Sequence, residues 1–577
     1  MAKDVSSVIL ETLASVGVRQ IFGIPGDAIN GLVDAIRRQD SIEFVTVRHE
    51  EAAAFAASAQ AKLTGRLGVV VGTAGPGAAH LLNGLYDANL DSAPVLAITG
   101  QVESSLLGAD AHQELDLQDL FGDVADFTET LVNPEQMPEL IHAAVRTALG
   151  ARAVSHLVIP SDLALAGVPN PDTSLVLPSG SQVRPADQDL DAAVGLIEEA
   201  SAVTLLVGIG ARDAVAEVLQ LAERVNAPII KTLRAKDLIP DEHPLVIGGL
   251  GLLGTEPAVH AIERTDLLIM IGTDFPYEDF YPESAKVIQI DVDRTHIGRR
   301  THVDVGLVGE SQESVQGLLS NLSAATDRRH LERAQSEMRD WWERMRDAEG
   351  DDSIPIRPQR VAAEIARAAG PGTIYLCDTG AVTVWAARNL RLQEGDRFTL
   401  SSNLASMAFA LPGAIGAQFA YPDSRVVALA GDGGFSMLIG DLITAVTHHL
   451  PITVVVFNNS KLGLIQMEQE AEGMPEFATR LDNPDFAEVA RAMGAEGHRV
   501  ERPEELGPAL AAAMASARPA VVDVVVNPEE ITMPPRIEAR FVLGYARAKL
   551  KEMVGQGQKE AGLGALEEPV KRLTDRL

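Results

Sequence analysis

Cysteine is almost absent from this sequence: Cys377 is the only one in 577 residues. A single thiol excludes a disulfide framework and any zinc or iron–sulfur site built from several cysteines. Cys377 ends the apolar run Thr373–Cys377. We therefore expect it to be a small buried strand residue rather than a reactive group.

Basic residues and long apolar runs are also scarce. The chain has 48 Lys and Arg against 81 Asp and Glu, a formal net charge of −33. This charge excludes nucleic-acid binding as the main role and argues against broad attachment to anionic lipid. No apolar run approaches the roughly 18 residues that span a bilayer, and an acid stands in the N-terminal segment where a signal peptide would be basic. We therefore expect a cytoplasmic protein.

Short apolar, β-branched runs alternate with helical patterns along most of the chain, as is typical of buried parallel strands. The runs are Gly68–Gly72, Val95–Ile98, Leu157–Ile159, Val203–Val207, Leu267–Ile271, Val287–Asp291, Val426–Ala430, Ile452–Phe457 and Val521–Val526. They predict an α/β protein with three doubly wound parallel-sheet domains. A Pro-rich stretch over 168–185 and a charged helical stretch over 327–352 separate them. The predicted domains are 1–175, 186–335 and 355–530, with a helical C-terminal tail over 531–577.

Two polar motifs directly follow strands of the third block, where parallel sheets bind ligands. Gly431–Gly434 reads Gly-Asp-Gly-Gly, and Asn458 and Asn459 follow the next strand. The intervening residues allow one helix over 437–449 and a return strand, so the two motifs can meet. A carboxylate and an amide oxygen suit Mg²⁺, and the glycines leave room for a diphosphate at a helix N-terminus.

This spacing resembles the signature of thiamine-diphosphate (ThDP) enzymes. The resemblance implies that Asp432 and Asn459 ligate Mg²⁺, that the carbonyl of Lys461 completes the metal site, and that Gly433 and Gly434 face the diphosphate.

In the first block, Arg48-His49-Glu50-Glu51 precedes an alanine-rich helical pattern. An acid there could simply interact with the helix dipole. By the resemblance, Glu50 instead bonds N1′ of the ThDP aminopyrimidine and promotes the tautomer that deprotonates thiazolium C2. A carboxyl in an apolar pocket can share this proton near neutral pH. Glu51 is expected to be less critical.

Two further segments resemble ThDP-contacting parts of the family. Met407 would be the apolar wedge under the cofactor, although a methionine there could also be ordinary core. Residues 462–468 resemble the active-site helix, with Leu464 between the cofactors, Ile465 by the thiazolium and Glu468 reaching substrate; an ordinary amphipathic helix fits the same spacing. The remaining implied ThDP contacts are Ala405, Ser406, Leu462 and Gly463.

The middle block resembles the FAD domain of pyruvate oxidases and pyruvate:quinone oxidoreductases. Arg212 and Arg234 suit the FAD phosphates through bidentate hydrogen bonds, and Asp291 would face the ribose. The other implied FAD contacts are Gly210, Leu250, Gly251, Leu252, Leu253, Thr273, Asp274, Phe275, Pro276 and Tyr277.

One departure concerns the substrate. The family commonly has Phe-Gln-Glu where this chain has His112-Gln113-Glu114. Gln113 can donate a hydrogen bond to a developing oxyanion. His112 either acts as an additional acid or base or bonds locally within its loop. The implied catalytic residues are thus Glu50, Gln113, Glu468 and His112, and the identity of the 2-oxo acid stays open.

The resemblance implies oxidative decarboxylation of pyruvate, or a related small 2-oxo acid, through hydroxyethyl-ThDP. Electrons would pass to FAD and then to a quinone or O₂, giving CO₂ and acetate, or acetyl phosphate if phosphate attacks. The alternatives are an acetolactate-synthase-like carboligase with a structural FAD and an inactive binding protein. A homotetramer is implied, with each active site between the first block of one subunit and the third block of its partner. The tail either contacts the inner face of the cell membrane, as in quinone-linked relatives, or packs on protein.

Overall fold

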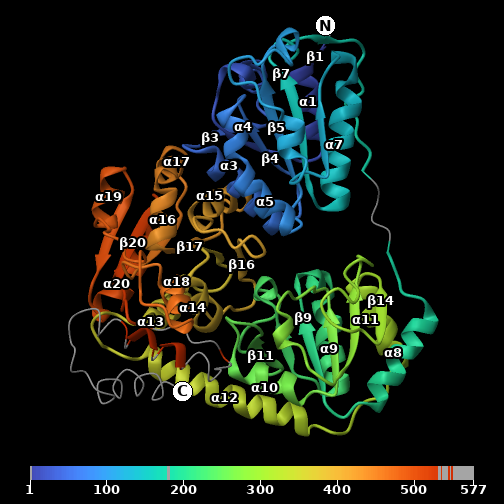
Figure 1. Cartoon of the computed structure of the whole chain (residues 1–577), viewed down its shortest axis with the longest axis vertical. Coiled ribbons are helices and arrows are strands. Elements are labelled where there is room, and N and C mark those ends of the chain that lie inside the picture. The colour runs from blue at the N-terminus through green and yellow to red at the C-terminus, as the bar shows by residue number, and fades with distance from the viewer. Residues whose placement is uncertain are drawn as a thin grey trace.

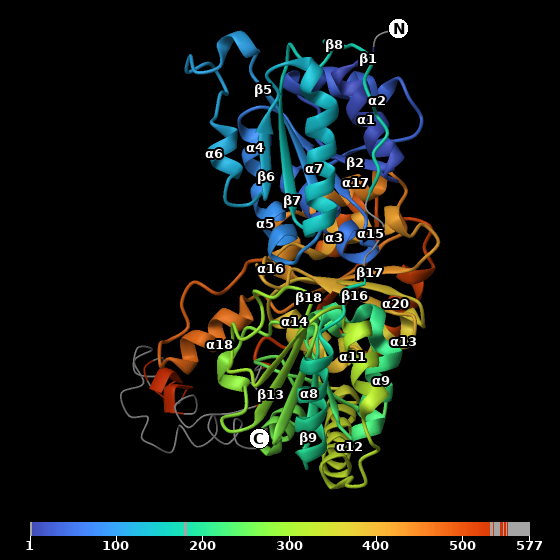
Figure 2. The same cartoon turned by 90° about the vertical axis from the view of Figure 1, so that its right-hand side faces the viewer.

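The computed structural model describes residues 3–177 and 182–530, together with 535, 543–545, 547–549 and 551 of the tail. These residues form three six-stranded parallel sheets and one short antiparallel pair (Figures 1 and 2). The predicted fold class is therefore confirmed. Most of the predicted tail helix lies outside the described residues.

The first sheet has the strand order β3-β2-β4-β5-β7-β6. In chain order its strands are β2 Gln20–Gly23, β3 Glu43–Thr46, β4 Gly68–Gly72, β5 Val95–Gln101, β6 Phe127–Thr130 and β7 Val154–Pro160. The helices around it are α1 Val5–Ser15, α2 Asn30–Arg37, α3 Glu50–Thr64, α4 Pro76–His80, α5 Leu82–Leu90, α6 Leu117–Phe121 and α7 Met137–Ala151. The antiparallel pair is β1 Lys3–Asp4 with β8 Gly167–Val168.

The second sheet has the order β11-β10-β9-β12-β13-β14. Its strands are β9 Val203–Val207, β10 Ile229–Lys231, β11 Val246–Gly249, β12 Leu267–Ile271, β13 Lys286–Asp291 and β14 Val305–Val308. Its helices are α8 Asp187–Glu199, α9 Val215–Val225, α10 Glu256–Arg264 and α11 Ser311–Asn321. The long helix α12, Arg329–Glu349, leads to the third sheet and runs along one side of the molecule (Figure 1).

The third sheet has the order β16-β15-β17-β18-β20-β19. Its strands are β15 Ile374–Cys377, β16 Arg397–Leu400, β17 Val426–Gly431, β18 Thr453–Asn458, β19 Glu496–Val500 and β20 Ala520–Val525. Its helices are α13 Pro358–Ala369, α14 Ala381–Asn389, α15 Ala410–Ala420, α16 Asp432–Met437, α17 Leu442–Thr447, α18 Gly463–Ala471, α19 Phe486–Ala492 and α20 Pro503–Ala515.

All the predicted apolar runs lie in strands that are buried on both faces, and Cys377 is fully buried in β15, as expected. The single helix predicted over 437–449 is wrong. Helix α16 begins at Asp432 itself, and the chain leaves helical geometry at Leu438 (φ −122°, ψ 25°) before a 3-10 turn, Ile439–Asp441, and α17. Gly440 has no side chain to favour a continuous helix here.

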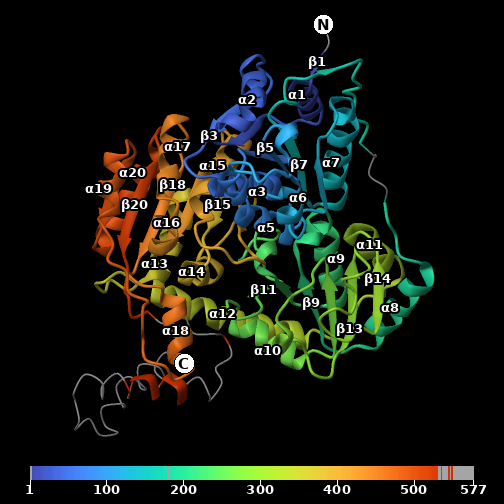
Figure 3. The ribbon, with the colours of Figure 1, turned by 45° about the horizontal axis from the view of Figure 1, so that its top comes forward.

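Helices α3 and α15 join the first and third sheets through a shared apolar core (Figure 3). Both are rich in alanine, and α15 also contains glycine, so their backbones pack closely: a Cβ on Gly416 would lie 2.0 Å from the carbonyl oxygen of Ala56. Beside this contact the Arg48 N–H donates to Oδ1 of Asp441 at 2.9 Å. None of the helices in the described part of the chain has the length and apolarity to span a membrane.

Candidate active site

The predicted metal residues gather where β17 and β18 end side by side. Asp432, only 2% exposed, follows β17. Its Oδ1 accepts from the Gly433 N–H at 2.9 Å and its Oδ2 from the Ser460 N–H at 2.7 Å. The two motifs therefore meet, as their spacing predicts. Burial raises the pKa of Asp432 to about 6, since water no longer solvates its charge.

Amide groups surround this carboxylate. Oδ1 of Asn459 accepts from the Lys461 N–H at 3.0 Å. Asn483, which sequence reasoning missed, donates from Nδ2 to Oδ2 of Asp432 at 2.7 Å and to Oδ1 of Asn458 at 3.1 Å. A buried carboxylate with the amide oxygens of Asn458 and Asn459 at the end of the neighbouring strand is a donor set that fits Mg²⁺. Asn483 follows no strand, so its position gave no signal.

Gly433 and Gly434 have close neighbours that leave no room for side chains. A Cβ on Gly433 would lie 3.1 Å from both the Met407 and Leu462 side chains, so the predicted wedge lies beside the glycine loop. A Cβ on Gly434 would lie 2.3 Å from Oδ2 of Asp378. The loop therefore keeps its backbone free of side chains at both positions, which fits a diphosphate.

Asp378 is a second buried acid that sequence reasoning missed, although it directly follows the predicted strand 373–377. Its Oδ1 accepts from the Ala410 N–H at 2.7 Å, and its Oδ2 has no hydrogen-bond partner among the described residues. Burial raises the pKa of Asp378 to about 7. The residue thus couples the start of α15 to the glycine loop.

Glu50 begins helix α3 and is 7% exposed. Its Oε2 lies 3.0 Å from Nδ1 of His80, and the imidazoles of His49 and His80 stack with centroids 4.5 Å apart. The ligand-type atoms of these three side chains lie within 4.8 Å of one another. Stacked rings do not aim at a common metal, so we assign His80 to the carboxylate. No hydrogen bond or ion pair joins Glu50 to the third domain within the described ranges.

The neighbouring Glu51 has a different position. Asn83 donates from Nδ2 to Oε1 of Glu51 at 2.7 Å and to Oγ of Ser406 at 3.1 Å. Ser406 and Ala405, both predicted ThDP contacts, are thus held near the first domain of the same chain, with Ala405 in left-handed backbone geometry (φ 57°). Glu51 acts in the contact between the two domains.

The predicted active-site helix is α18, and the tail packs on it. Ile465, which is 45% exposed, and Glu468 lie one turn apart on its open side, and Leu464 is half-buried. On the covered side, Glu470 accepts from Gln466 at 2.9 Å and from Nζ of Lys549 at 2.7 Å. The described tail residues therefore contact the helix that carries the predicted substrate-facing side chains.

The His112–Glu114 segment lies in an exposed loop of the first domain. Glu114 accepts hydrogen bonds from the backbone N–H groups of Ala111 and Gly108, which lower its pKa and hold the loop. Gln113 has left-handed backbone geometry (φ 65°) and lies against Gly75, whose added Cβ would be 3.0 Å away. His112 is exposed. The structure thus gives Glu114 the local structural role.

The predicted FAD arginines have carboxylate partners. Nη2 of Arg212 donates to Asp237 at 2.9 and 3.0 Å. Nη1 of Arg234 lies 3.7 Å from Oδ1 of Asp91. Arg152, which sequence reasoning missed, lies close to both: partial desolvation and repulsion from Arg234 and Arg212 lower its pKa. Three arginines between the first and central domains could hold an anionic diphosphate.

The predicted flavin-lining segments come together. Gly251 has φ 93°, and a Cβ there would lie 3.1 Å from the Phe275 ring and 3.2 Å from the Tyr277 ring. Arg388, a buried residue of α14, donates to the carbonyls of Leu252, Leu253 and Gly254 at 3.2, 3.3 and 3.0 Å. Leu252 and Tyr277 remain 50% and 45% exposed, an apolar surface that a flat ring could cover.

The other predicted FAD residues lie around the same strand ends. Gly210 packs on Gly272, and a Cβ on Gly210 would lie 2.9 Å from the Gly272 Cα. Asp274 pairs with Arg299 and Arg300 at 3.1 and 3.2 Å. Oδ1 of Asp291 accepts from the Asp293 N–H at 2.9 Å. Thr273 is buried after β12, between Gly272 and Asp274.

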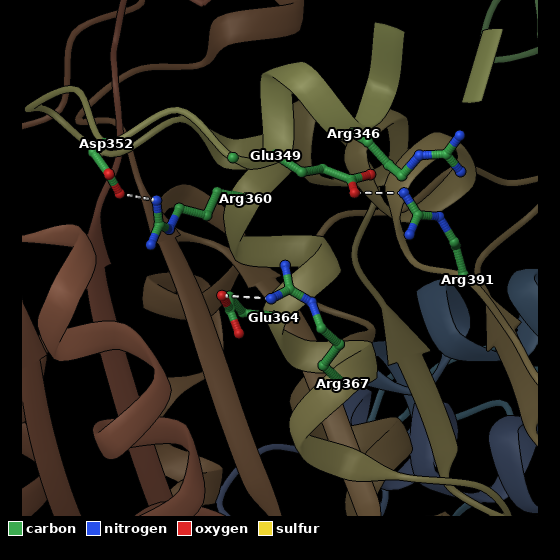
Figure 4. Close-up of a pocket in the computed structure, with 8 residues that line it drawn as sticks. Arg346, Glu349, Asp352, Arg360, Glu364, Arg367 and Arg391 are labelled. Atoms are coloured by element: carbon green, nitrogen blue, oxygen red, sulfur yellow. Dashed lines mark hydrogen bonds and ion pairs between the residues drawn. The ribbon is translucent and has the colours of Figure 1, made fainter. Parts of the chain in front are cut away.

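A pocket of about 330 Å³ opens between α12, α13 and the segment after α14 (Figure 4). Its lining residues are Arg346, Glu349, Gly350, Asp352, Arg360, Glu364, Arg367 and Arg391. The ion pair Arg391–Glu349 links the segment after α14 to α12, and Arg367–Glu364 is a pair within α13. None of these residues is among those predicted from the sequence, so the pocket is separate from the site described above.

Comparison with known proteins matches three family models to the three sheets. The thiamine pyrophosphate enzyme N-terminal TPP binding domain matches residues 3–120, the central domain 190–318 and the C-terminal TPP binding domain 378–524. A putative thiamine pyrophosphate-containing protein, YdaP of Bacillus subtilis, is 40% identical over 99% of both chains.

Two enzymes are similar at lower identity. The pyruvate oxidase of Lactiplantibacillus plantarum is 32% identical over 90% of this chain and 88% of its own. The acetolactate synthase large subunit of Corynebacterium glutamicum is 33% identical over 92% of this chain and 88% of its own.

Proposed function

Because the chain belongs to the thiamine pyrophosphate enzyme family, we propose that it is a ThDP- and FAD-dependent oxidoreductase acting on pyruvate or a related small 2-oxo acid. The reaction releases CO₂ and acetate and passes electrons to a quinone or to O₂. The observation that carries this proposal is that one chain has both the buried Asp432 cluster and the arginine- and glycine-lined loops of the central domain.

In this proposal the third domain binds the diphosphate end of ThDP. Asp432, Asn459 and the carbonyl of Lys461 hold Mg²⁺, and Gly433 and Gly434 face the phosphates. ThDP supplies a carbanion-stabilising thiazolium. Glu50 holds and releases the proton that activates the heterocycle, a role that suits a buried carboxyl. Burial of Asp432 supports its metal role, because an uncompensated charge there is costly and a cation would offset it.

The central domain binds FAD. Arg212 and Arg234, with Arg152 beside them, face the phosphates, while residues 250–253 and 273–277 line the flavin. Gln113 donates to the substrate oxygen, and His112 and Glu468 are the remaining groups that could exchange a proton with substrate. Arg388 supports this assignment indirectly, because its three hydrogen bonds fix the backbone of the 252–254 segment.

The active site is shared between subunits of a homotetramer. All side-chain partners of Glu50 among the described residues belong to its own first domain. In this proposal a cofactor anchored at Asp432 meets the Glu50 of a partner subunit, so that neither subunit alone holds a complete site. The domain limits and the peripheral contact of the tail with the inner face of the membrane both remain predictions.

A carboligase that resembles acetolactate synthase is the second candidate. The observation that favours it is the 33% identity to the Corynebacterium enzyme, which matches the 32% identity to the pyruvate oxidase. Product analysis separates the two. With pyruvate and ferricyanide, which accepts one electron, an oxidoreductase gives one acetate and two ferrocyanide for each CO₂ released, whereas a carboligase gives acetolactate without using the acceptor.

A further inference from the structure

His80 is the side chain that contacts the Glu50 carboxylate. Its Nδ1 lies 3.0 Å from Oε2 of Glu50. Glu50 begins α3, whereas His80 ends α4. Helix α4 starts within the segment Gly72–Gly77 of the first domain, which is separate from the glycine loop of the third domain. The Glu50 side chain is 9% exposed and that of His80 is 46% exposed. The contact thus joins a buried acid to the surface of the first domain.

The direction of this hydrogen bond follows from the groups involved. When Glu50 is ionised, its carboxylate only accepts, and the pairing then requires the tautomer of His80 in which Nδ1 carries the proton. His49 stacks on the His80 ring at 4.5 Å with an interplanar angle of 26°. The Glu51 N–H donates to Nδ1 of His49 at 3.2 Å, which holds the stacking ring in place. The plane of the His80 imidazole is therefore fixed from one side by a ring that is itself anchored.

The other oxygen of Glu50 lies close to Gly77. A Cβ added to Gly77 would lie 3.3 Å from Oε1, so the glycine keeps a methyl group away from this oxygen. One carboxylate oxygen is thus held by a donor, while the other faces backbone without a side chain. A carboxyl held in this way presents Oε1 in a single orientation.

Resting on the proposed function, we infer that His80 is a positioning residue for Glu50. Its Nδ1–H bond to Oε2 stops the carboxyl from rotating, and Oε1 is left for the aminopyrimidine nitrogen of ThDP. Without this bond Glu50 would still be buried, but its carboxyl would sample several orientations. Proton exchange with the cofactor would slow, while cofactor binding at the third domain would persist.

The test compares two substitutions of His80 in the full-length protein. H80L removes the donor at similar volume, and H80N restores an N–H near the position of Nδ1. The readout is the deuterium exchange rate at C2 of bound ThDP. We expect H80L to slow exchange roughly 10- to 100-fold, the loss expected for a hydrogen bond to a charged group. H80N should exchange within about threefold of the wild type, and both variants should bind Mg²⁺–ThDP with wild-type affinity.

A control pair lies between the first and third domains. Nδ1 of His448 lies 3.2 Å from Oε1 of Glu43, so this pair has the same chemistry away from Glu50. H448L should leave the exchange rate unchanged. A crystal structure of cofactor-free H80L should also show the Glu50 carboxyl rotated while α3 keeps its place.

The inference would be overturned if C2 of bound ThDP exchanged at the wild-type rate in H80L. It would also be overturned if exchange at C2 were as slow in H80N as in H80L. Should H80L fail to fold, H80Q replaces it, because its amide is one methylene too distant to mimic Nδ1. Failure of the proposed function looks different. E50Q would then exchange C2 at the wild-type rate, or Mg²⁺–ThDP would not bind to the wild-type protein at all.

Discussion

Asn483 donates a hydrogen bond of 2.7 Å to the carboxylate of Asp432, 51 residues earlier in the chain. The bond favours the ionised form of Asp432, whereas burial opposes it, and burial prevails so that the pKa rises to about 6. The predicted metal ligand is therefore mostly ionised at pH 7. Below a pH of about 6, a cation must displace a proton to bind there.

Mg²⁺-dependent binding of ThDP should consequently weaken in acid. Below a pH of about 6, metal-free Asp432 is mostly protonated, and affinity should fall about tenfold per pH unit. Above that pH, affinity should level off. Calorimetry between pH 5 and pH 8 checks this. N483L removes a donor that stabilises the carboxylate. In this variant the pH below which ThDP affinity falls should therefore be higher than in the wild type.

D432A is the control for this prediction, since it should abolish Mg²⁺-dependent binding at every pH. Affinity that stays flat down to pH 5 in the wild type would contradict the assignment of Asp432 as a ligand.

Asp378 should give the protein a second pH dependence, this time in stability. Its pKa is raised from 3.8 to about 7 in the folded state by burial. Between these values the folded state binds a proton that the unfolded state releases, so the free energy of unfolding rises as pH falls from about 8 to 4. The slope is on the order of 1 kcal/mol per pH unit.

D378N cannot take up this proton, so its free energy of unfolding should depend less steeply on pH than that of the wild type. The measurement is the free energy of unfolding by denaturant, as a function of pH, for cofactor-free wild type and D378N. Asp432 is present in both proteins, so its titration contributes equally to the two profiles. Parallel profiles for the two proteins would show that Asp378 does not titrate in this range.

Sharing of the active site between subunits can be tested by mixing two inactive variants. E50Q lacks the activating acid and D432A lacks the metal ligand. In a mixed dimer, one of the two sites receives an intact Glu50 and an intact Asp432 from different subunits. Random mixing should restore about one quarter of wild-type activity, since half of the dimers are mixed. Mixtures as inactive as either variant would place the whole site within one subunit.

Deletion of the residues after Pro535 tests the tail. The tail contacts α18 through Lys549 and Glu470, so its removal should loosen the helix that carries Glu468. If contact with α18 is its only role, activity should fall equally with ferricyanide and with quinone embedded in lipid. Selective loss with the lipid-embedded quinone would instead indicate membrane contact.

Much of the fold was predictable because strands buried on both faces must be apolar throughout, as β4, β9 and β12 are. Edge strands such as β3 and β19 are partly exposed and lack that signal. The break after α16 was not predicted, because the residues around Gly440 are individually compatible with a helix. It is set by tertiary contact, including the bond from Arg48 to Asp441.

The candidate site was predictable where a residue directly follows a strand. Asp432 and Asn459 do so, and the strand pairing of β17 and β18 brings them together. Asn483, His80 and Arg388 reach their partners through loops or helices distant in sequence, and nothing local marks them. Glu114 belongs to the segment 112–114 that was predicted to be catalytic. In the structure its carboxylate accepts hydrogen bonds from backbone N–H groups of its own loop, so its role there is to hold the loop.

The most direct test of the proposed chemistry is the flavin spectrum of the purified protein without O₂, before and after addition of pyruvate. An oxidoreductase with the residues described should bleach its bound flavin at once, and E50Q should keep its flavin oxidised under the same conditions. A wild-type flavin that stays oxidised while pyruvate is consumed and acetolactate accumulates would contradict the proposal.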